Sequence, residues 1–302
     1  MLIFIEQVLN GLNYGLLLFM IAAGLSLVFG VMHLINLAHG SLFMIGAFVT
    51  VGATQWTGSF WLGVICGAAT AFVTGLAIER IIVRPLYARD HLDQVLATFG
   101  LILFFNELLR WISGGAPLFV PTPQGLSGAA EISEGFYYSR YRIVVTAAAL
   151  MMAICLWLVL TRTKIGMLIR ASANNPEMVG HIGYDVRTVG TLVFGVGAAL
   201  AGIAGALNGP LVSIEVGMGE QVLILAFVIV VIGGMGSIQG TFYASILIGF
   251  VDTMGRAYTP IILSGLFETR TVASVSPAIS AIIIYIVMAA VLIARPSGLF
   301  SK

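Results

Sequence analysis

The sequence predicts an all-α integral membrane protein, a polytopic helical bundle of about 8–9 transmembrane helices with broken or re-entrant segments. The first observation behind this prediction is composition: 59% of the 302 residues are hydrophobic and 9% are charged, whereas soluble domains carry about 25% charged residues. The second is a series of apolar segments, most of them close to the roughly 20 residues that a helix needs to cross a bilayer. In lipid each helix satisfies its own backbone hydrogen bonds, so helices are the expected element.

The apolar segments follow one another without a break that would separate two domains, so we expect one membrane domain over residues 1–302. The chain has 36 glycines. Several lie one helical turn from another small residue, as in Gly63/Gly67 and Ala198/Gly202, and such pairs predict close helix packing. The expected spans cover residues 8–30, 41–57, 59–79, 94–112, 142–161, 188–208, 221–236, 238–255 and 272–294.

Basic residues orient these spans, because cytoplasmic loops of membrane proteins are enriched in Lys and Arg. Three stretches are therefore expected in the cytoplasm, and a proline- and glycine-containing loop at 113–139 is expected outside. If all three segments before the first basic stretch cross the membrane, the N-terminus is external. If one of them is re-entrant, there are eight spans and the N-terminus is internal. The basic stretches contain Arg80, Arg84 and Arg89, then Arg162, Lys164, Arg170 and Arg187, then Arg295 and Lys302.

The second cytoplasmic stretch, residues 162–187, contains the signals of a short helix of its own. Asn175 can cap its start, Pro176 suits the first helical position, and Gly183 can end it. Asp185 can then cap the next membrane helix, which begins near Val186. The apolar residues expected to share one exposed face of the short helix are Met178, Val179 and Ile182.

A polar interruption at Asn36, His39, Gly40 and Ser41 divides an otherwise apolar region and carries no acidic or basic side chain other than histidine. Unwound backbone inside a membrane is tolerated where it is buried in protein or lines a cavity. We therefore favour a broken helix beside a solute pathway over an ordinary turn between spans. Gln239-Gly240 begins a later apolar segment in the same way as His39-Gly40, which is a weak sign of an internal repeat.

Enzyme motifs are absent from the sequence, so we expect no catalytic activity, no metal site and no cofactor on this chain. There is no GxxxxGK[ST], HExxH, CxxC or GxSxG sequence. No basic patch with interleaved aromatics points to nucleic acid. Two pairs, Glu107/Arg110 and Asp252/Arg256, have the spacing of local ion pairs on a helix, which is a likelier role than proton transfer.

Three stretches, taken together, resemble the permease subunits of branched-chain amino acid ABC importers of the LivH type, and they occur in that family's order. They are GLSLVFGVMHLINLAHGSLFMIGAFV, GMLIRASANNPEMVGHIGYDVRTVGTLVFGVGAALAGIAGAL and VIVVIGGMGSIQGTFYASILIGFVD. The resemblance implies a multi-pass protein of the bacterial inner membrane. It also implies a second, homologous permease subunit, two separate ATPase subunits that hydrolyse ATP, and a periplasmic substrate-binding protein.

The resemblance further implies that the cytoplasmic loop docks on the ATPase. The residues of this coupling loop would be Gly166, Arg170, Ala171, Asn174, Asn175, Pro176, Met178, Val179, Ile182, Gly183 and Asp185. The polar interruption and the similar later stretch separately give the candidate solute pathway, which contains Asn36, His39, Gly40, Ser41, Gln239 and Gly240. Urea, amide and aromatic-acid importers are similar in sequence, so the solute stays open. An ion-coupled secondary transporter is a rival class; it would need intramembrane ionisable residues, of which the chain has few.

Overall fold

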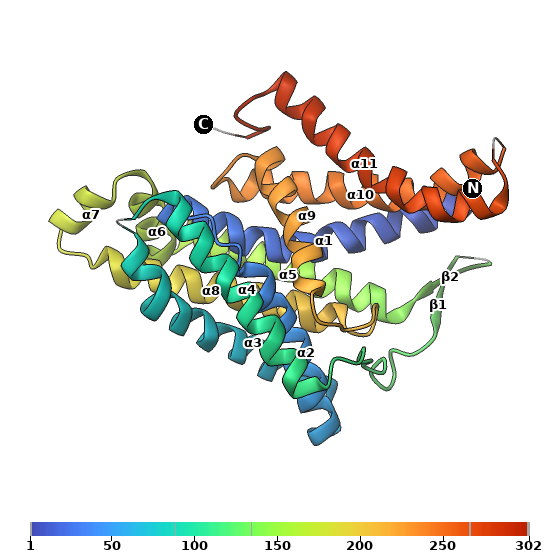
Figure 1. Ribbon diagram of the computed structural model, residues 1–302, viewed down its shortest axis with the longest axis horizontal. Helices are drawn as coiled ribbons and strands as arrows, with labels where there is room; N and C mark the ends of the chain where they lie inside the picture. The colour runs from blue at the N-terminus through green and yellow to red at the C-terminus, as the bar shows by residue number, and fades with distance from the viewer. Residues whose placement is uncertain (1, 88, 134, 266, 301–302) are drawn as a thin grey trace.

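The protein is described by a computed structural model that covers residues 2–300 except 88, 134 and 266, so Lys302 lies outside it (Figure 1). Within these residues it is almost entirely helical, with one short β-hairpin. The helices are α1 Leu2–Met32, α2 His39–Thr57, α3 Phe60–Ile78, α4 His91–Ser113, α5 Arg140–Arg162, α6 Lys164–Asn174, α7 Pro176–His181, α8 Val186–Asn208, α9 Met218–Gly233, α10 Ile238–Ser264 and α11 Thr269–Ala294.

Every expected span is a helix, and the all-α membrane fold is confirmed. Seven of the helices are long and apolar enough to cross a membrane: α1, α3 with its extension to Leu86, α4, α5, α8, α10 and α11. The other two expected spans, α2 and α9, are shorter or more polar and lie among the rest of the bundle. The break in the chain between α1 and α2 agrees with the broken helix that the sequence predicted.

The two ends of the bundle differ in what they carry. Figure 1 shows α6 and α7 at one end of the long axis, and the β-hairpin with the N-terminus at the other. Met32, the last residue of α1, contacts the hydroxyl of Tyr87, which belongs to the first basic stretch. The end of α1 and the two basic stretches thus lie at the same end of the protein. With these stretches taken as cytoplasmic, the N-terminus is external.

The expected external loop contains a small element that the sequence did not predict. Strands β1 Ala129–Ser133 and β2 Phe136–Ser139 pair antiparallel, with Ala130 opposite Tyr138. Leu118 of the same loop forms a two-residue bridge with Ile214, in the segment between α8 and α9. The loop is therefore folded against the end of the bundle.

The centre of the bundle is closed by contacts between glycines. A Cβ built on Gly46 of α2 would lie 2.3 Å from the carbonyl oxygen of Gly202 in α8. A Cβ on Gly249 of α10 would lie 2.4 Å from the Cα of Gly15 in α1. No side chain fits at either crossing, so the helix backbones touch, as the small-residue spacing predicted.

Burial separates an inner group of helices from an outer one. In the most apolar stretch of α1, 83% of residues are buried, and in that of α8, 72%, against 11% in α11. The outer helices instead expose large apolar side chains, such as Phe104 of α4, Ile154 of α5 and Ile286 of α11. Such a surface suits lipid as the surrounding medium.

Candidate functional site

The loop between α5 and α8 has the local structure that the sequence predicted for its second half. The Asn175 side chain accepts a hydrogen bond from the Met178 amide at 3.0 Å and caps α7, whose first residue is Pro176. Gly183 follows α7 with a φ of 94°, in the left-handed region that favours glycine. Asp185 then accepts a hydrogen bond from the Arg187 amide at 3.0 Å and caps α8.

The first half of this loop contains a helix that the sequence reasoning missed. The Thr163 hydroxyl accepts a hydrogen bond from the Gly166 amide at 3.1 Å and caps α6. A Cβ on Gly166 would lie 2.2 Å from the Val159 carbonyl oxygen, so only glycine lets α6 begin so close to α5. The usable signals were the Thr163 cap and the inward-facing residues at helical spacing, namely Leu168, Ile169, Ser172 and Ala173.

The three apolar residues of α7 do not share one exposed face. Met178 and Ile182 are 56% and 67% exposed, as predicted, but Val179 is only 5% exposed. Neighbouring residues of a helix point about 100° apart, and α7 lies against the protein on the side of Val179. Helix α7 contacts α6 and α8, so the burial of Val179 holds α7 against these neighbouring helices. The apolar side chains that the loop exposes are Ile165, Met167, Met178, Ile182 and Tyr184.

The remaining predicted residues of the loop hold the junction between α6 and α7. Arg170 donates to the Leu160 carbonyl, and Asn174 donates to the Arg170 carbonyl at 2.9 Å. The Ala171 carbonyl accepts from the Asn175 amide at 2.9 Å. These bonds join the end of α5, the whole of α6 and the cap of α7, so the loop is a structured unit.

Asp185 carries a negative charge where α8 begins. The hydrogen bond from the Thr188 hydroxyl, at 2.5 Å, holds the pKa of this carboxyl below its usual range, and the Arg187 amide acts in the same direction. A carboxylate that stays ionised at neutral pH interacts favourably with the positive end of the helix dipole. The join between α7 and α8 is thus both short and anchored.

The polar interruption after α1 lies inside the protein. Asn36 and His39 are fully buried and Ser41 is 3% exposed. The His39 ring contacts the carbonyl of Ile21 at 3.1 Å, through Nε2. Since Ile21 precedes the end of α1 at Met32 by eleven residues, the chain folds back about 16 Å along α1 before α2 begins. An ordinary surface turn does not fit this position.

Polar atoms in this buried segment are only partly satisfied. The Asn36 side-chain oxygen accepts a hydrogen bond from the Ala38 amide at 3.1 Å. Among the described residues, Asn36 Nδ2 and His39 Nδ1 find no partner. Buried polar groups of this kind are costly unless water or a solute completes them, so they are uncommon in a purely packing segment.

Gly40 and Gly240, the glycines of the two similar stretches, have the same structural role at opposite ends of α9. A Cβ on Gly40, at the start of α2, would lie 2.3 Å from the Gly219 carbonyl oxygen at the start of α9. A Cβ on Gly240, at the start of α10, would lie 1.9 Å from the Gly233 carbonyl oxygen at the end of α9. Helix α9 is therefore held at both ends by the starts of two other helices.

Gln239, in contrast, does not join the buried segment. It is exposed and lines an apolar groove of about 350 Å³ between α5, α10 and the C-terminal residues, together with Trp157, Tyr243 and Phe300. The structure therefore brings together Asn36, His39, Gly40 and Ser41, and sets Gln239 apart from them.

Glu107 and Arg110 form an exposed ion pair at 2.7 Å, and Arg256 pairs with the buried Asp252 at 2.8 Å, as predicted. No group of three or more His, Cys, Asp or Glu side chains placed to hold a metal occurs among the described residues.

Comparisons with known proteins agree with this architecture. The family "Branched-chain amino acid transport system / permease component" matches residues 7–292. The permease protein BraD of a high-affinity branched-chain amino acid transport system in Pseudomonas aeruginosa is 29% identical over 280 residues, which are 87% of this chain and 91% of BraD. LivH of Escherichia coli K12, described in the same terms, is 28% identical over 269 residues, 85% of this chain and 87% of LivH.

A further permease protein of the same kind of system, LivM of Escherichia coli K12, is 26% identical over 275 residues, 80% of this chain and 63% of LivM. No solved structure matches the chain. The family match covers nearly the whole bundle, including the loop at residues 162–187 and the buried segment after α1. The chain therefore belongs to the family of permease components of branched-chain amino acid transport systems.

Proposed function

We propose that this chain is the transmembrane permease subunit of an ATP-binding-cassette importer that carries branched-chain amino acids across the bacterial inner membrane. The observation that carries the proposal is a family match from residue 7 to residue 292, joined to relatives whose names state branched-chain amino acid transport. The chain itself binds no cofactor in this proposal, and the energy comes from ATP hydrolysed on other subunits.

The partners follow from the same proposal. A second permease subunit completes the pathway, and the similarity of this chain to both LivH and LivM supports a pair of related permeases. Two ATPase subunits bind on the cytoplasmic side, and a periplasmic binding protein delivers the solute.

We assign the ATPase-docking role to the coupling loop, residues 162–187. Support comes from its five exposed apolar side chains at the end of the bundle that carries the basic stretches. Exposed apolar clusters rimmed by polar residues commonly mark protein interfaces. Only residues 182–185 connect the end of α7 at His181 to α8, so movement of α7 reaches a membrane helix with little slack.

The buried segment from Asn36 to Ser41 is assigned to the solute pathway. Support comes from its incompletely bonded polar atoms and from its position beside the start of α9. A free amino acid carries charged amino and carboxylate groups, which need polar partners in transit. Gln239 belongs to the pathway in this proposal through the groove that it lines, which would have to face the other permease subunit.

The ion-coupled alternative is weakened by how the buried acids are used. Asp252 is paired with Arg256, and Glu79, also fully buried, is paired with Arg84. An acid that already has a permanent partner is poorly suited to bind and release a coupling ion.

The test is uptake by proteoliposomes that contain this permease, its neighbouring permease, the ATPase subunits and the binding protein. Uptake of radiolabelled leucine should require ATP inside and binding protein outside, and should persist when proton and sodium gradients are collapsed. Competition by isoleucine and valine, but not by urea, acetamide or benzoate, is expected. Uptake that follows an ion gradient without ATP would contradict the proposal.

A further inference from the structure

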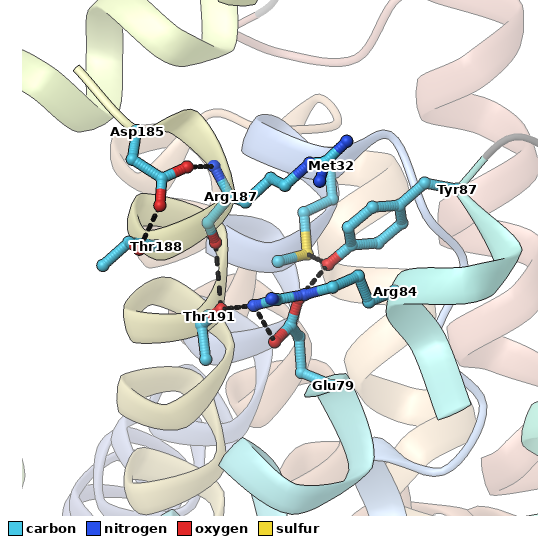
Figure 2. A network of polar contacts seen from close by, with 8 residues as sticks. All are labelled: Met32, Glu79, Arg84, Tyr87, Asp185, Arg187, Thr188 and Thr191. Atoms are coloured by element: carbon cyan, nitrogen blue, oxygen red, sulfur yellow. Dashed lines mark hydrogen bonds and ion pairs between the residues drawn. The ribbon is translucent and has the colours of Figure 1, made fainter. Parts of the chain in front are cut away.

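A buried carboxylate that the sequence analysis did not single out lies at the cytoplasmic end of α3. Glu79 is fully buried and accepts hydrogen bonds from Arg84 Nε at 3.3 Å, Arg84 Nη2 at 3.2 Å and the Tyr87 hydroxyl at 2.7 Å (Figure 2). A buried charge is costly unless it is paired and hydrogen-bonded, and these three bonds meet that condition.

The backbone explains why Arg84 reaches Glu79. Residues Glu79–Val83 form a single π-helical turn, in which the Arg84 amide donates to the Glu79 carbonyl. In an α-helix, residues five apart point about 140° away from each other, whereas the wider π turn brings them to nearly the same side. A short 3₁₀ turn, Arg84–Leu86, follows, and its second residue is Pro85, which cannot donate a backbone hydrogen bond.

From Glu79 the contacts reach α8 just after the coupling loop. The same Nη2 of Arg84 donates to the Thr191 hydroxyl at 2.5 Å, and this hydroxyl donates to the Arg187 carbonyl at 2.9 Å. Figure 2 shows Arg84 lying between Glu79 on one side and Thr191 on the other. Thr191 is on the second turn of α8, six residues after Asp185.

The contacts also reach α1. The Tyr87 hydroxyl lies 3.6 Å from the sulfur of Met32, and since its one proton is donated to Glu79, its contact with Met32 is a packing contact. Met32 is the last residue of α1, and His33 follows it with a φ of 53°, which is uncommon for a residue other than glycine. Asn36, where the buried pathway segment begins, follows three residues after His33.

We infer that Glu79 is a positioning residue that, through Arg84 and Tyr87, joins the first turns of α8 to the ends of α3 and α1, so that movement of the coupling loop reaches the buried pathway segment. This inference rests on the proposed function of the coupling loop. It adds a connection from the loop to α1, beside the chain connection that leads from α7 into α8.

The sharpest perturbation is at Thr191, because it breaks the connection and leaves the buried ion pair in place. Thr191→Val keeps the shape of the side chain and removes the acceptor for Arg84, whereas Thr191→Ser keeps the hydroxyl. Thr161→Val is the matched control, because the Thr161 hydroxyl also bonds the carbonyl four residues earlier, that of Trp157, and contacts no other element by hydrogen bond among the described residues. Glu79→Gln removes the charge at the centre of the cluster.

The measurement is leucine uptake per ATP hydrolysed by the complete reconstituted importer, with ATPase co-purification as a second readout. Thr191→Val and Glu79→Gln should retain the ATPase subunits and lower the ratio of uptake to hydrolysis by about tenfold, the factor for a lost hydrogen bond to a charged group. Thr191→Ser and Thr161→Val should keep the wild-type ratio.

An unchanged ratio in Thr191→Val and Glu79→Gln would overturn the inference and leave the proposed function standing. The inference is also overturned if Thr191→Ser loses as much coupling as Thr191→Val, since the hydroxyl would then not be the feature that matters. Failure of the wild-type permease to retain ATPase subunits would instead contradict the proposed function itself.

Discussion

Replacing Gly40 by alanine tests the close contact between α2 and α9 in the candidate pathway. The added Cβ would lie 2.3 Å from the Gly219 carbonyl oxygen and 2.8 Å from its carbonyl carbon, both of which are backbone atoms. Ordinary contacts begin at 3.4 Å, so α2 and α9 would have to separate by about 1 Å. Forced repacking of this kind costs about 1–3 kcal/mol, and a clash with backbone on both sides points to the upper part of that range.

Gly52→Ala provides the matched control on the same helix. A Cβ at Gly52 would meet nothing within 4 Å. Replacing glycine by alanine in a helix interior stabilises it by about 0.5–1 kcal/mol; this gain applies to Gly52 and is smaller at Gly40, the second residue of α2. The clash is the larger contribution to the difference, and we expect Gly40→Ala to be less stable than Gly52→Ala by at least about 1–3 kcal/mol.

The assay is unfolding of the purified permease in detergent micelles by a titration with SDS, followed by circular dichroism. Leucine uptake by the assembled importer, measured alongside, should fall in Gly40→Ala and more steeply in Gly40→Leu, and stay near wild type in Gly52→Ala. Equal stability of Gly40→Ala and Gly52→Ala would refute the reasoning, because the backbones of α2 and α9 could not then be in contact.

Three further outcomes are expected. The purified chain should hydrolyse no ATP, since it has no nucleotide motif; turnover that survives removal of contaminating ATPases and is lost on mutating this chain would contradict this. In a background without Cys66 and Cys155, Glu177→Cys should react with a membrane-impermeant thiol reagent from the cytoplasmic side only and Ser127→Cys from outside only; labelling of both from one side would reverse the orientation. Glu177 is exposed, so a cysteine there is accessible to the reagent. Tyr141→Phe should lower the free energy of unfolding in the SDS titration by about 1–2 kcal/mol. The buried Tyr141 hydroxyl donates to the Leu207 carbonyl at 2.7 Å, and its loss leaves that carbonyl unpaired. Tyr137→Phe, at an exposed position, should leave the stability unchanged, and equal effects of the two substitutions would argue against the bond.

The spans and the caps of the short helix could be predicted from sequence because both depend on local chemistry. The length of an apolar segment determines whether it can span the membrane. The bounds of α7 are determined by Asn175, Pro176 and Gly183, through hydrogen bonds and backbone angles within a few residues. The cap of α8 by Asp185 is equally local. These are the features in which the structure agrees most closely with the prediction.

What could not be predicted depends on contacts between distant segments. Val179 is apolar like Met178 and Ile182, and it is buried because of how α7 packs against α6 and α8. The depth at which α2 begins depends on how far residues 33–38 fold back along α1. The separation of Gln239 from Asn36 is likewise a property of the assembled bundle, which two similar five-residue stretches do not encode.

Glu79 was missed for a related reason. At helical spacing, Glu79 and Arg84 lie on different sides of an α-helix, and only a π turn brings them together. The available signal was Pro85 directly after a basic residue at the end of an apolar segment, which indicates that the regular hydrogen-bond pattern has to change there.

The docking of ATPase subunits on the coupling loop is the central claim, and substitution of Met178 tests it most directly. Met178 is 56% exposed, so an acidic side chain there costs the folded permease little. Met178→Asp places a charge in the proposed apolar interface, whereas Met178→Leu keeps its apolar character.

The measurement is the amount of ATPase subunit that co-purifies with each permease variant from membranes, with leucine uptake measured on the same preparations. The account predicts that Met178→Asp inserts at wild-type level but retains little ATPase and transports no leucine, and that Met178→Leu behaves as wild type. Wild-type recovery of ATPase together with wild-type uptake in Met178→Asp would contradict the account.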